Sequence, residues 1–185
     1  MASAPLLEAL LLCLILPAWL LAGFGDALCH RALRIEKSSG WRESALHWVM
    51  LAELGVAVAA ILLLEIDASV IALFAIACLA HEVTMVADLR YAHAHRDIPP
   101  VEQWVHGIQQ AMPWIVLLCI VLLHPGQALA LLGLGDEPAR WALERRQPAL
   151  PRGYLFAFAA GALLLVGLPF GLEAWRAARA ARVHA

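Results

Sequence analysis

Residues 45–64 read ALHWVMLAELGVAVAAILLL, a run of twenty residues in which Glu53 is the only one with a formal charge. About twenty apolar residues make a helix long enough to cross a hydrocarbon core about 30 Å thick. In lipid the backbone polar groups need hydrogen-bond partners within the segment, which favours an α-helix. The run therefore predicts one membrane-spanning helix.

Four further apolar runs lie on either side of this one, at Pro5–Phe24, Ala68–Ala87, Val101–Leu123 and Tyr154–Leu172. The whole chain of 185 residues is 63% hydrophobic and 15% charged, with a mean hydropathy of +0.76. A soluble domain is nearer 45–50% apolar and 25% charged. We therefore expect an all-α integral membrane bundle of about five helices, with residues 1–185 as a single membrane domain.

The connecting segments predict the orientation in the membrane. Nine Lys and Arg residues fall on the side reached after the first run and four on the other side. By the positive-inside rule the richer side is cytoplasmic, so the N-terminus is expected outside and the C-terminus inside, in a bacterial inner membrane. The first helix is expected to extend to residue 37. Residues 125–152 are expected to form an extracytoplasmic loop, in which Asp136 caps a short amphipathic helix at Glu137–Arg146.

Three carboxylates each precede a histidine by four residues: Asp26–His30, Glu43–His47 and Glu102–His106. Residues four apart share one face of a helix, so the two side chains of each pair can bind the same metal ion. Eight histidines and fifteen acids scattered at random over 185 residues give fewer than one such pair. The repetition indicates one site built from several helices.

The predicted topology brings these pairs to the same membrane side and adds two residues from the third run. His81 and Asp88 are seven apart and share a helix face there. Ionisable groups at membrane depth are costly and usually face the protein interior, where they need partners. The predicted metal ligands are Asp26, His30, Glu43, His47, His81, Asp88, Glu102 and His106.

Eight mixed ligands exceed the four of a structural zinc ion and match two divalent ions bridged by carboxylates. Carboxylate and imidazole ligands suit iron, which we favour, and also zinc or manganese. The four cysteines show no C-x-x-C spacing, so a thiolate site is not expected. Soluble di-iron bundles use an analogous inward set of Glu and His, although at Glu-x-x-His spacing.

The first functional hypothesis is a membrane metalloenzyme acting on a lipid or lipid-soluble substrate with a redox partner. We favour an oxidoreductase over a zinc hydrolase, in which Glu82, Glu43 or Asp88 is the general base. The pair His93 and His95 is read as a loop pair that is either solvated or an additional ligand.

Three alternatives stay open at this stage. His47 and His106 can be axial ligands of haem b in an electron-transfer protein. The same polar groups can form the path of a metal-ion or proton-coupled transporter. They can also form a structural hydrogen-bond network in an accessory membrane protein. The sequence has no basic stripe, so a nucleic-acid partner is not expected.

Overall fold

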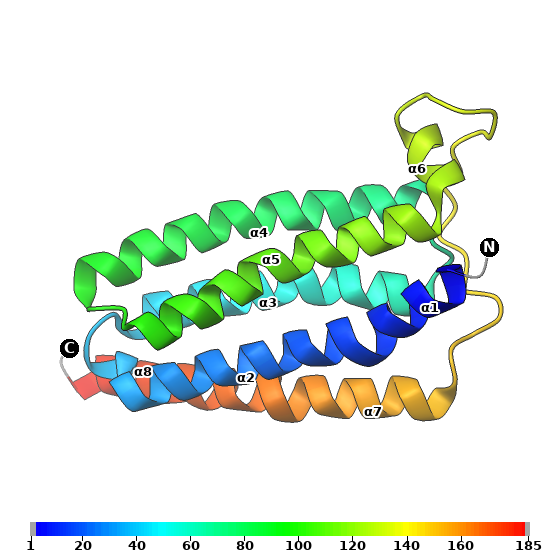
Figure 1. The fold of residues 1–185 in the computed structure, drawn as a ribbon. Helices are drawn as coiled ribbons and strands as arrows, with labels where there is room; N and C mark the ends of the chain where they lie inside the picture. Colours follow the sequence, from blue (N-terminus) through cyan, green and yellow to red (C-terminus); the bar gives the residue numbers. More distant parts are fainter. Residues whose placement is uncertain (1–2, 184–185) are drawn as a thin grey trace.

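The structure is a computed structural model that describes residues 3–183 as a bundle of long helices lying side by side (Figure 1). The first rod is continuous and consists of α1 (Ser3–Leu10), the π-helical turn η1 (Leu11–Ile15) and α2 (Leu16–Leu33). The next three are α3 (Gly40–Leu63), α4 (Ala68–His95) and α5 (Pro100–Leu123). The last rod joins α7 (Arg152–Ala162), the π-helical turn η3 (Leu163–Gly167) and α8 (Leu168–Val183).

The predicted fold class is confirmed at the level of architecture. Within residues 3–183 all five rods are long and apolar enough to cross a membrane, and no β-strand forms. Large apolar side chains such as Val56, Ile76 and Phe156 are exposed on the outside of the bundle. Such a surface fits a lipid environment and is unfavourable in water. The chain is therefore a multi-pass helical membrane protein.

Several helices extend further than the apolar runs predict. The second begins at Gly40, the third continues to His95 and the fifth continues to Val183. Each of these polar ends has some side chains buried in the bundle, such as Glu43, Asp88 and Glu173. The expected extension of the first helix to residue 37 is wrong in detail. Its α-helix ends at Leu33, because Arg34 adopts the left-handed conformation with φ of 54°, and a short 3₁₀ turn η2 (Ile35–Lys37) follows.

The predicted amphipathic helix at Glu137–Arg146 is wrong. The long loop instead holds α6 (Pro125–Leu131), and residues 137–146 are not helical. Their backbone is engaged elsewhere: the amide of Arg146 donates to the carbonyl of Leu63, and the carbonyl of Glu144 accepts from the amide of Glu65. The loop therefore runs across the α3–α4 turn and is held by that turn's free backbone groups.

The two ends of the bundle are built differently. The N-terminus, α6 and the α3–α4 turn lie at one end, and the α2–α3 and α4–α5 loops lie at the other with the C-terminus (Figure 1). The main apolar core includes Leu16, Ile61, Phe74 and Ile120, all with at most 2% exposure. At the other end, where α8 packs against α3 and α2 against α5, the interior is polar.

Candidate metal centre

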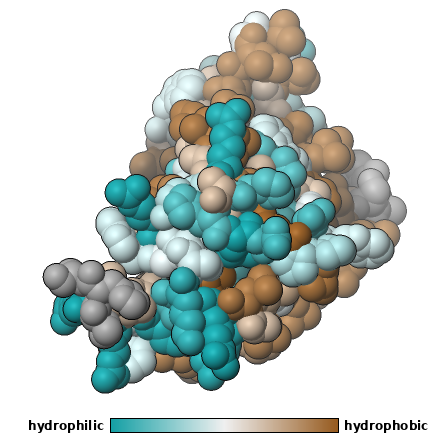
Figure 2. All heavy atoms as spheres, turned by 90° about the vertical axis from the view of Figure 1, so that its left-hand side faces the viewer, coloured by the Kyte–Doolittle hydropathy of each residue, from teal (hydrophilic) through white to brown (hydrophobic). Residues whose placement is uncertain are grey.

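Buried ionisable side chains gather at the end of the bundle formed by the α2–α3 and α4–α5 loops. Figure 2 views this end and shows hydrophilic residues over much of its surface. Beneath that surface, every long rod contributes to one group, which we call the polar cluster: Asp26 and His30 from α2, Glu43 and His47 from α3, Asp88 from α4, Glu102 and His106 from α5, and Glu173 from α8. Except for His106, each of these residues is at most 5% exposed.

Glu173 joins two histidines from different helices. One of its oxygens lies 2.8 Å from Nδ1 of His30 and the other lies 2.9 Å from Nδ1 of His47. An ionised carboxylate can only accept hydrogen bonds, so both Nδ1 atoms are donors in this arrangement. If the imidazoles are neutral, their Nε2 atoms carry the free lone pairs. Glu173 thereby sets the tautomer and the orientation of both rings.

The Nε2 side of His30 faces one carboxylate of its own pair and one of another pair. Its Nε2 lies 3.4 Å from an oxygen of Asp26 and 3.4 Å from an oxygen of Glu102. Nε2 of His106 lies 3.1 Å from the same oxygen of Asp26. Asp26, His30, Glu102 and His106 each offer one atom, and these four atoms all lie within 4.8 Å of one another. Two imidazoles and two carboxylates so arranged can surround one cation.

A second set of close ligand atoms shares His30 with the first. It consists of His30, Glu43 and His47, again within 4.8 Å of one another. The rings of His30 and His47 stack with centroids 4.5 Å apart and an interplanar angle of 11°. The Nε2 atoms of both rings are buried and have no hydrogen-bond partner among the described residues. When both imidazoles are neutral, these two lone pairs are available to a cation.

Arg96 closes the cluster from the α4–α5 loop. Its guanidinium donates to Glu43 at 2.6 and 3.2 Å and to Glu102 at 2.5 and 2.9 Å. Burial alone would lower the pKa of Arg96, but the hydrogen bonds and charges of Glu102 and Glu43 raise it above its ordinary value. Arg96 therefore stays charged and fixes the orientation of both carboxylates.

The charges in this buried region do not balance. Five carboxylates (Asp26, Glu43, Asp88, Glu102 and Glu173) face one guanidinium, so four negative charges are in excess when the histidines are neutral. An uncompensated buried charge costs several kcal/mol or more. The excess must therefore be offset by protons on the histidines or the carboxylates, or by bound cations.

His81 and Asp88 lie at the edge of this arrangement. Asp88 approaches Nε2 of His47 at 3.6 Å, and one of its oxygens is buried without a partner. His81 belongs to neither set of close ligand atoms. It borders a small cavity of about 30 Å³ that Asp26, His47, Asp88 and His106 also line. Seven of the eight predicted ligands thus lie together in the polar cluster, and His81 lines the same small cavity.

Glu82, predicted as a general base, lies outside the polar cluster. It accepts hydrogen bonds from Nε1 of Trp114 at 2.8 Å and from Gln110 at 3.3 Å. The physical reason is the helix period, which turns Glu82 about 100° away from His81. His93 and His95 are exposed residues of the last turn of α4, not of a loop, and Nδ1 of His95 lies 2.7 Å from the carbonyl of Tyr91.

Two members of the site were not among the predicted ligands. Glu173 lies just beyond the last apolar run and looks like part of a surface tail. Its place was indicated by spacing, since the buried residues Val166, Phe170, Glu173 and Ala177 follow the helical period. Arg96 looks like an interfacial anchor, and nothing local in the sequence distinguishes it from Arg90.

Fold and site together define a multi-pass helical membrane protein with a buried histidine–carboxylate cluster. No protein-family model, curated sequence or solved structure significantly matches the chain. Its function therefore has to be argued from this geometry.

Proposed function

We propose that the polar cluster is the metal centre of a membrane enzyme. The observation that carries the proposal is the Glu173 bridge. Metal-binding histidines almost always donate their second ring nitrogen to a carboxylate or carbonyl, which fixes the tautomer and strengthens the ligand. Here one carboxylate does this for His30 and His47 together, while their Nε2 atoms remain without partners beside Asp26, Glu102 and Asp88.

The charge excess favours two divalent ions. Two such ions would match the four excess negative charges of the cluster. His30 has only Nε2 to offer because Nδ1 is held by Glu173, so it can bind one ion. We assign that ion to Asp26, His30, Glu102 and His106, and a second to His47 and Asp88 beside the small cavity. Iron suits this donor set best, with zinc or manganese as alternatives.

Haem and transport receive less support. The cavity that both His47 and His106 line has a volume of about 30 Å³, enough for a water molecule or an ion but not for a porphyrin. For transport, polar groups would have to continue through the bundle. Beyond the cluster the described interior is instead an apolar core around Phe74 and Ile120.

The chemistry we favour is oxidation of a lipid or lipid-soluble substrate, for which bound iron would activate oxygen and a redox partner would supply electrons. A zinc-dependent hydrolase is the alternative, with metal-bound water as nucleophile. Of the predicted bases, Asp88 is the better candidate, because one of its oxygens is free while Glu43 is held by Arg96. We further propose that the cluster end faces the cytoplasm of a bacterium, following the excess of Lys and Arg there.

Elemental analysis and an absorption spectrum of detergent-purified protein test this proposal. We expect two divalent ions per chain, with His30→Ala and His106→Ala each losing metal while remaining folded and monodisperse. His124→Ala is the matched control, because that histidine caps α5 at the opposite end of the bundle and should leave the metal content unchanged. Protein without stoichiometric metal would overturn the proposal, a Soret band would select haem, and proton-driven metal uptake into vesicles would select transport.

A further inference from the structure

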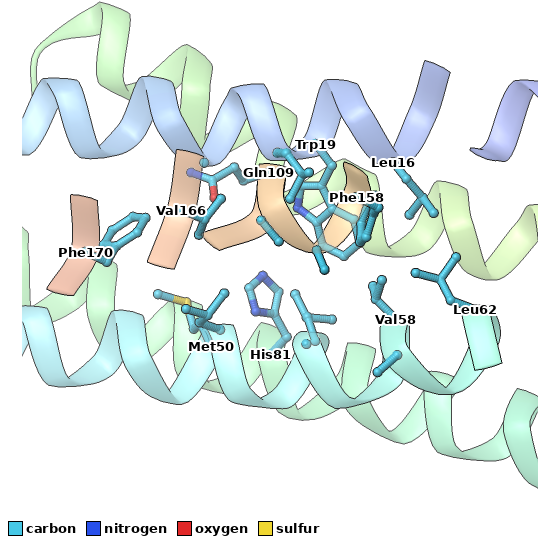
Figure 3. Close-up of a pocket in the computed structure, with 18 of the residues that line it drawn as sticks. Leu16, Trp19, Met50, Val58, Leu62, His81, Gln109, Phe158, Val166 and Phe170 are labelled. Atoms are coloured by element: carbon cyan, nitrogen blue, oxygen red, sulfur yellow. The ribbon is translucent and has the colours of Figure 1, made fainter. Parts of the chain in front are cut away.

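A second, much larger cavity adjoins the polar cluster. It has a volume of about 460 Å³ and lies between α2, α3 and the last rod (Figure 3). This volume is within the usual range of ligand-binding pockets, roughly 300–1,000 Å³. Most of its wall is apolar, with Trp19 from α2, Val58 from α3 and Phe158 from α7 among the lining residues.

The polar residues of this wall lie in the half of the cavity nearer the polar cluster. They are Asp26, His47, His81 and Gln109, and the first two belong to the polar cluster. His81 and Gln109 line the cavity in Figure 3, whereas Leu62 lies toward its opposite end. Nδ1 of His81 is buried and has no hydrogen-bond partner among the described residues. A buried, unpartnered nitrogen of this kind is costly unless a ligand or water satisfies it.

The cavity is long and opens sideways. Between His47 and Leu63, which both line it, α3 rises about 24 Å, more than half of a hydrocarbon core. The exposed small residues Gly55, Ala59 and Ala159 also line it, at the seam where α3 faces α7. α3 packs closely against α8 but not against α7, and a Cβ added at Gly55 would meet no atom within 4 Å. A molecule dissolved in the bilayer can enter there without crossing water.

We propose that this cavity binds a single-chain lipid with an uncharged hydrogen-bonding end, such as a long-chain alcohol or aldehyde. The chain lies along the apolar wall, and the polar end meets His81 and Gln109 beside the metal centre. This inference rests on the proposed function in one respect, that the bound lipid is the substrate of that centre. The binding itself depends only on the cavity.

Charge and size select this class of lipid. No Lys or Arg lines the cavity, so no cationic side chain there can pair with an anionic headgroup. His81 can donate or accept a hydrogen bond, and Gln109 can do both, which suits a hydroxyl or carbonyl group. A cavity of about 460 Å³ cannot hold a phospholipid with two chains and a headgroup.

Photo-crosslinking of the full-length, detergent-purified protein tests the proposal. The probes are a long-chain alcohol with a diazirine in its chain, the fatty acid of equal length and a diazirine phospholipid. We expect the alcohol to label cavity-lining peptides of α3 and α7 most strongly. Equal labelling by the three probes, or labelling confined to the outer surface, would overturn the proposal.

Two Val→Trp variants distinguish labelling inside the cavity from labelling on the lipid-facing surface. Val58→Trp fills the cavity and should abolish labelling by the alcohol. Val56→Trp, on the same helix with the side chain 61% exposed, should not change it. If Val58→Trp fails to fold, Gly55→Leu replaces it, because it narrows the opening at a position with free space and improves helix propensity. Labelling that survives both Val58→Trp and Gly55→Leu would refute the assignment.

Metal content measured on the same samples keeps the two proposals apart. Val58→Trp should retain metal while losing the lipid, whereas His106→Ala should lose metal and still be labelled. His81→Leu should reduce labelling by the alcohol and leave the metal in place, because His81 faces the lipid in this arrangement and belongs to neither set of close ligand atoms. Loss of metal in His81→Leu with labelling intact would contradict this role.

Discussion

Glu173→Gln is the most informative single change, because it alters one atom of a residue that would touch no metal ion. The carboxylate accepts from Nδ1 of His30 at 2.8 Å and from Nδ1 of His47 at 2.9 Å. An amide of the same shape has one accepting oxygen and one donating NH₂ group. One histidine therefore faces a donor and must turn its ring or move its proton to Nε2, which removes the lone pair that would bind the ion.

The expected size of this effect follows from other metal sites. Loss of a hydrogen-bond partner behind a metal ligand costs about 10–100-fold in affinity, which is about 1.4–2.8 kcal/mol. The measurement is competition for iron or zinc between metal-free protein in detergent and a chromophoric chelator. Thermal unfolding with and without metal is recorded in parallel. We expect weaker binding and a smaller metal-induced rise in Tm, because the stabilisation of the folded state by a ligand grows with the logarithm of its affinity.

Glu53→Gln is the matched control. Glu53 is an acid on α3 that accepts from Thr84 at 2.8 Å and takes no part in the polar cluster. Its replacement should leave metal affinity unchanged. Glu173→Asp keeps the charge on a shorter side chain and should retain part of the affinity. If Glu173→Gln binds metal as tightly as the unaltered protein, the tautomer-setting role of Glu173 is refuted.

Three further predictions concern the cluster and, for comparison, the opposite end of the bundle. Arg96→Met leaves Glu43 and Glu102 without their cation. It should lower the free energy of unfolding of the metal-free protein by about 3 kcal/mol, and that of the metal-bound protein by less. Thermal melts of both forms measure the difference. Acidification should release the metal, because carboxylates and histidines must be deprotonated to bind it; a metal content independent of pH between neutral and mildly acidic buffer would argue against these ligands. Asp67→Ala removes the side chain that accepts from the amides of Ser69 and Val70 at the start of α4. It should lower the free energy of unfolding by about 1 kcal/mol and leave the metal content unchanged. Chemical denaturation measures the first effect and elemental analysis the second.

Much of this architecture can be predicted from the sequence, because a membrane restricts the chain to long apolar helices. Apolar length alone predicts a helix, and residues 45–64 lie within α3 except for their last residue. The i, i+4 spacing correctly predicts that Asp26 and His30 lie on one helix face, because the helical period depends only on nearby residues. Helix ends were less predictable. α3 and α8 continue into polar sequence because partners from other helices bury those polar residues, and the partners are far away in the chain.

Glu173 and Arg96 illustrate what local pattern misses. Each is one charged residue among several near a membrane interface, and its neighbours in sequence say nothing of His30 or Glu43. Their roles arise from long-range contacts: 143 residues separate His30 from Glu173, and 53 separate Glu43 from Arg96. Glu82 shows the opposite case: its chemical type suits a general base, but the helix period turns it away from His81.

One end of the bundle has an apolar core and the other has a polar one, so the proposed metal ions would also affect how the helices pack. Near α6, apolar side chains such as Phe74 and Ile120 hold the helices together whatever is bound. At the other end all five rods meet through acids and histidines, and Arg96 alone among the described Lys and Arg side chains pairs with those acids. Without added positive charge the excess of carboxylates pushes α2, α3, α5 and α8 apart. Cations there would therefore do two things at once: they would close that end of the bundle, and they would complete the wall that the large cavity shares with the cluster at Asp26 and His47.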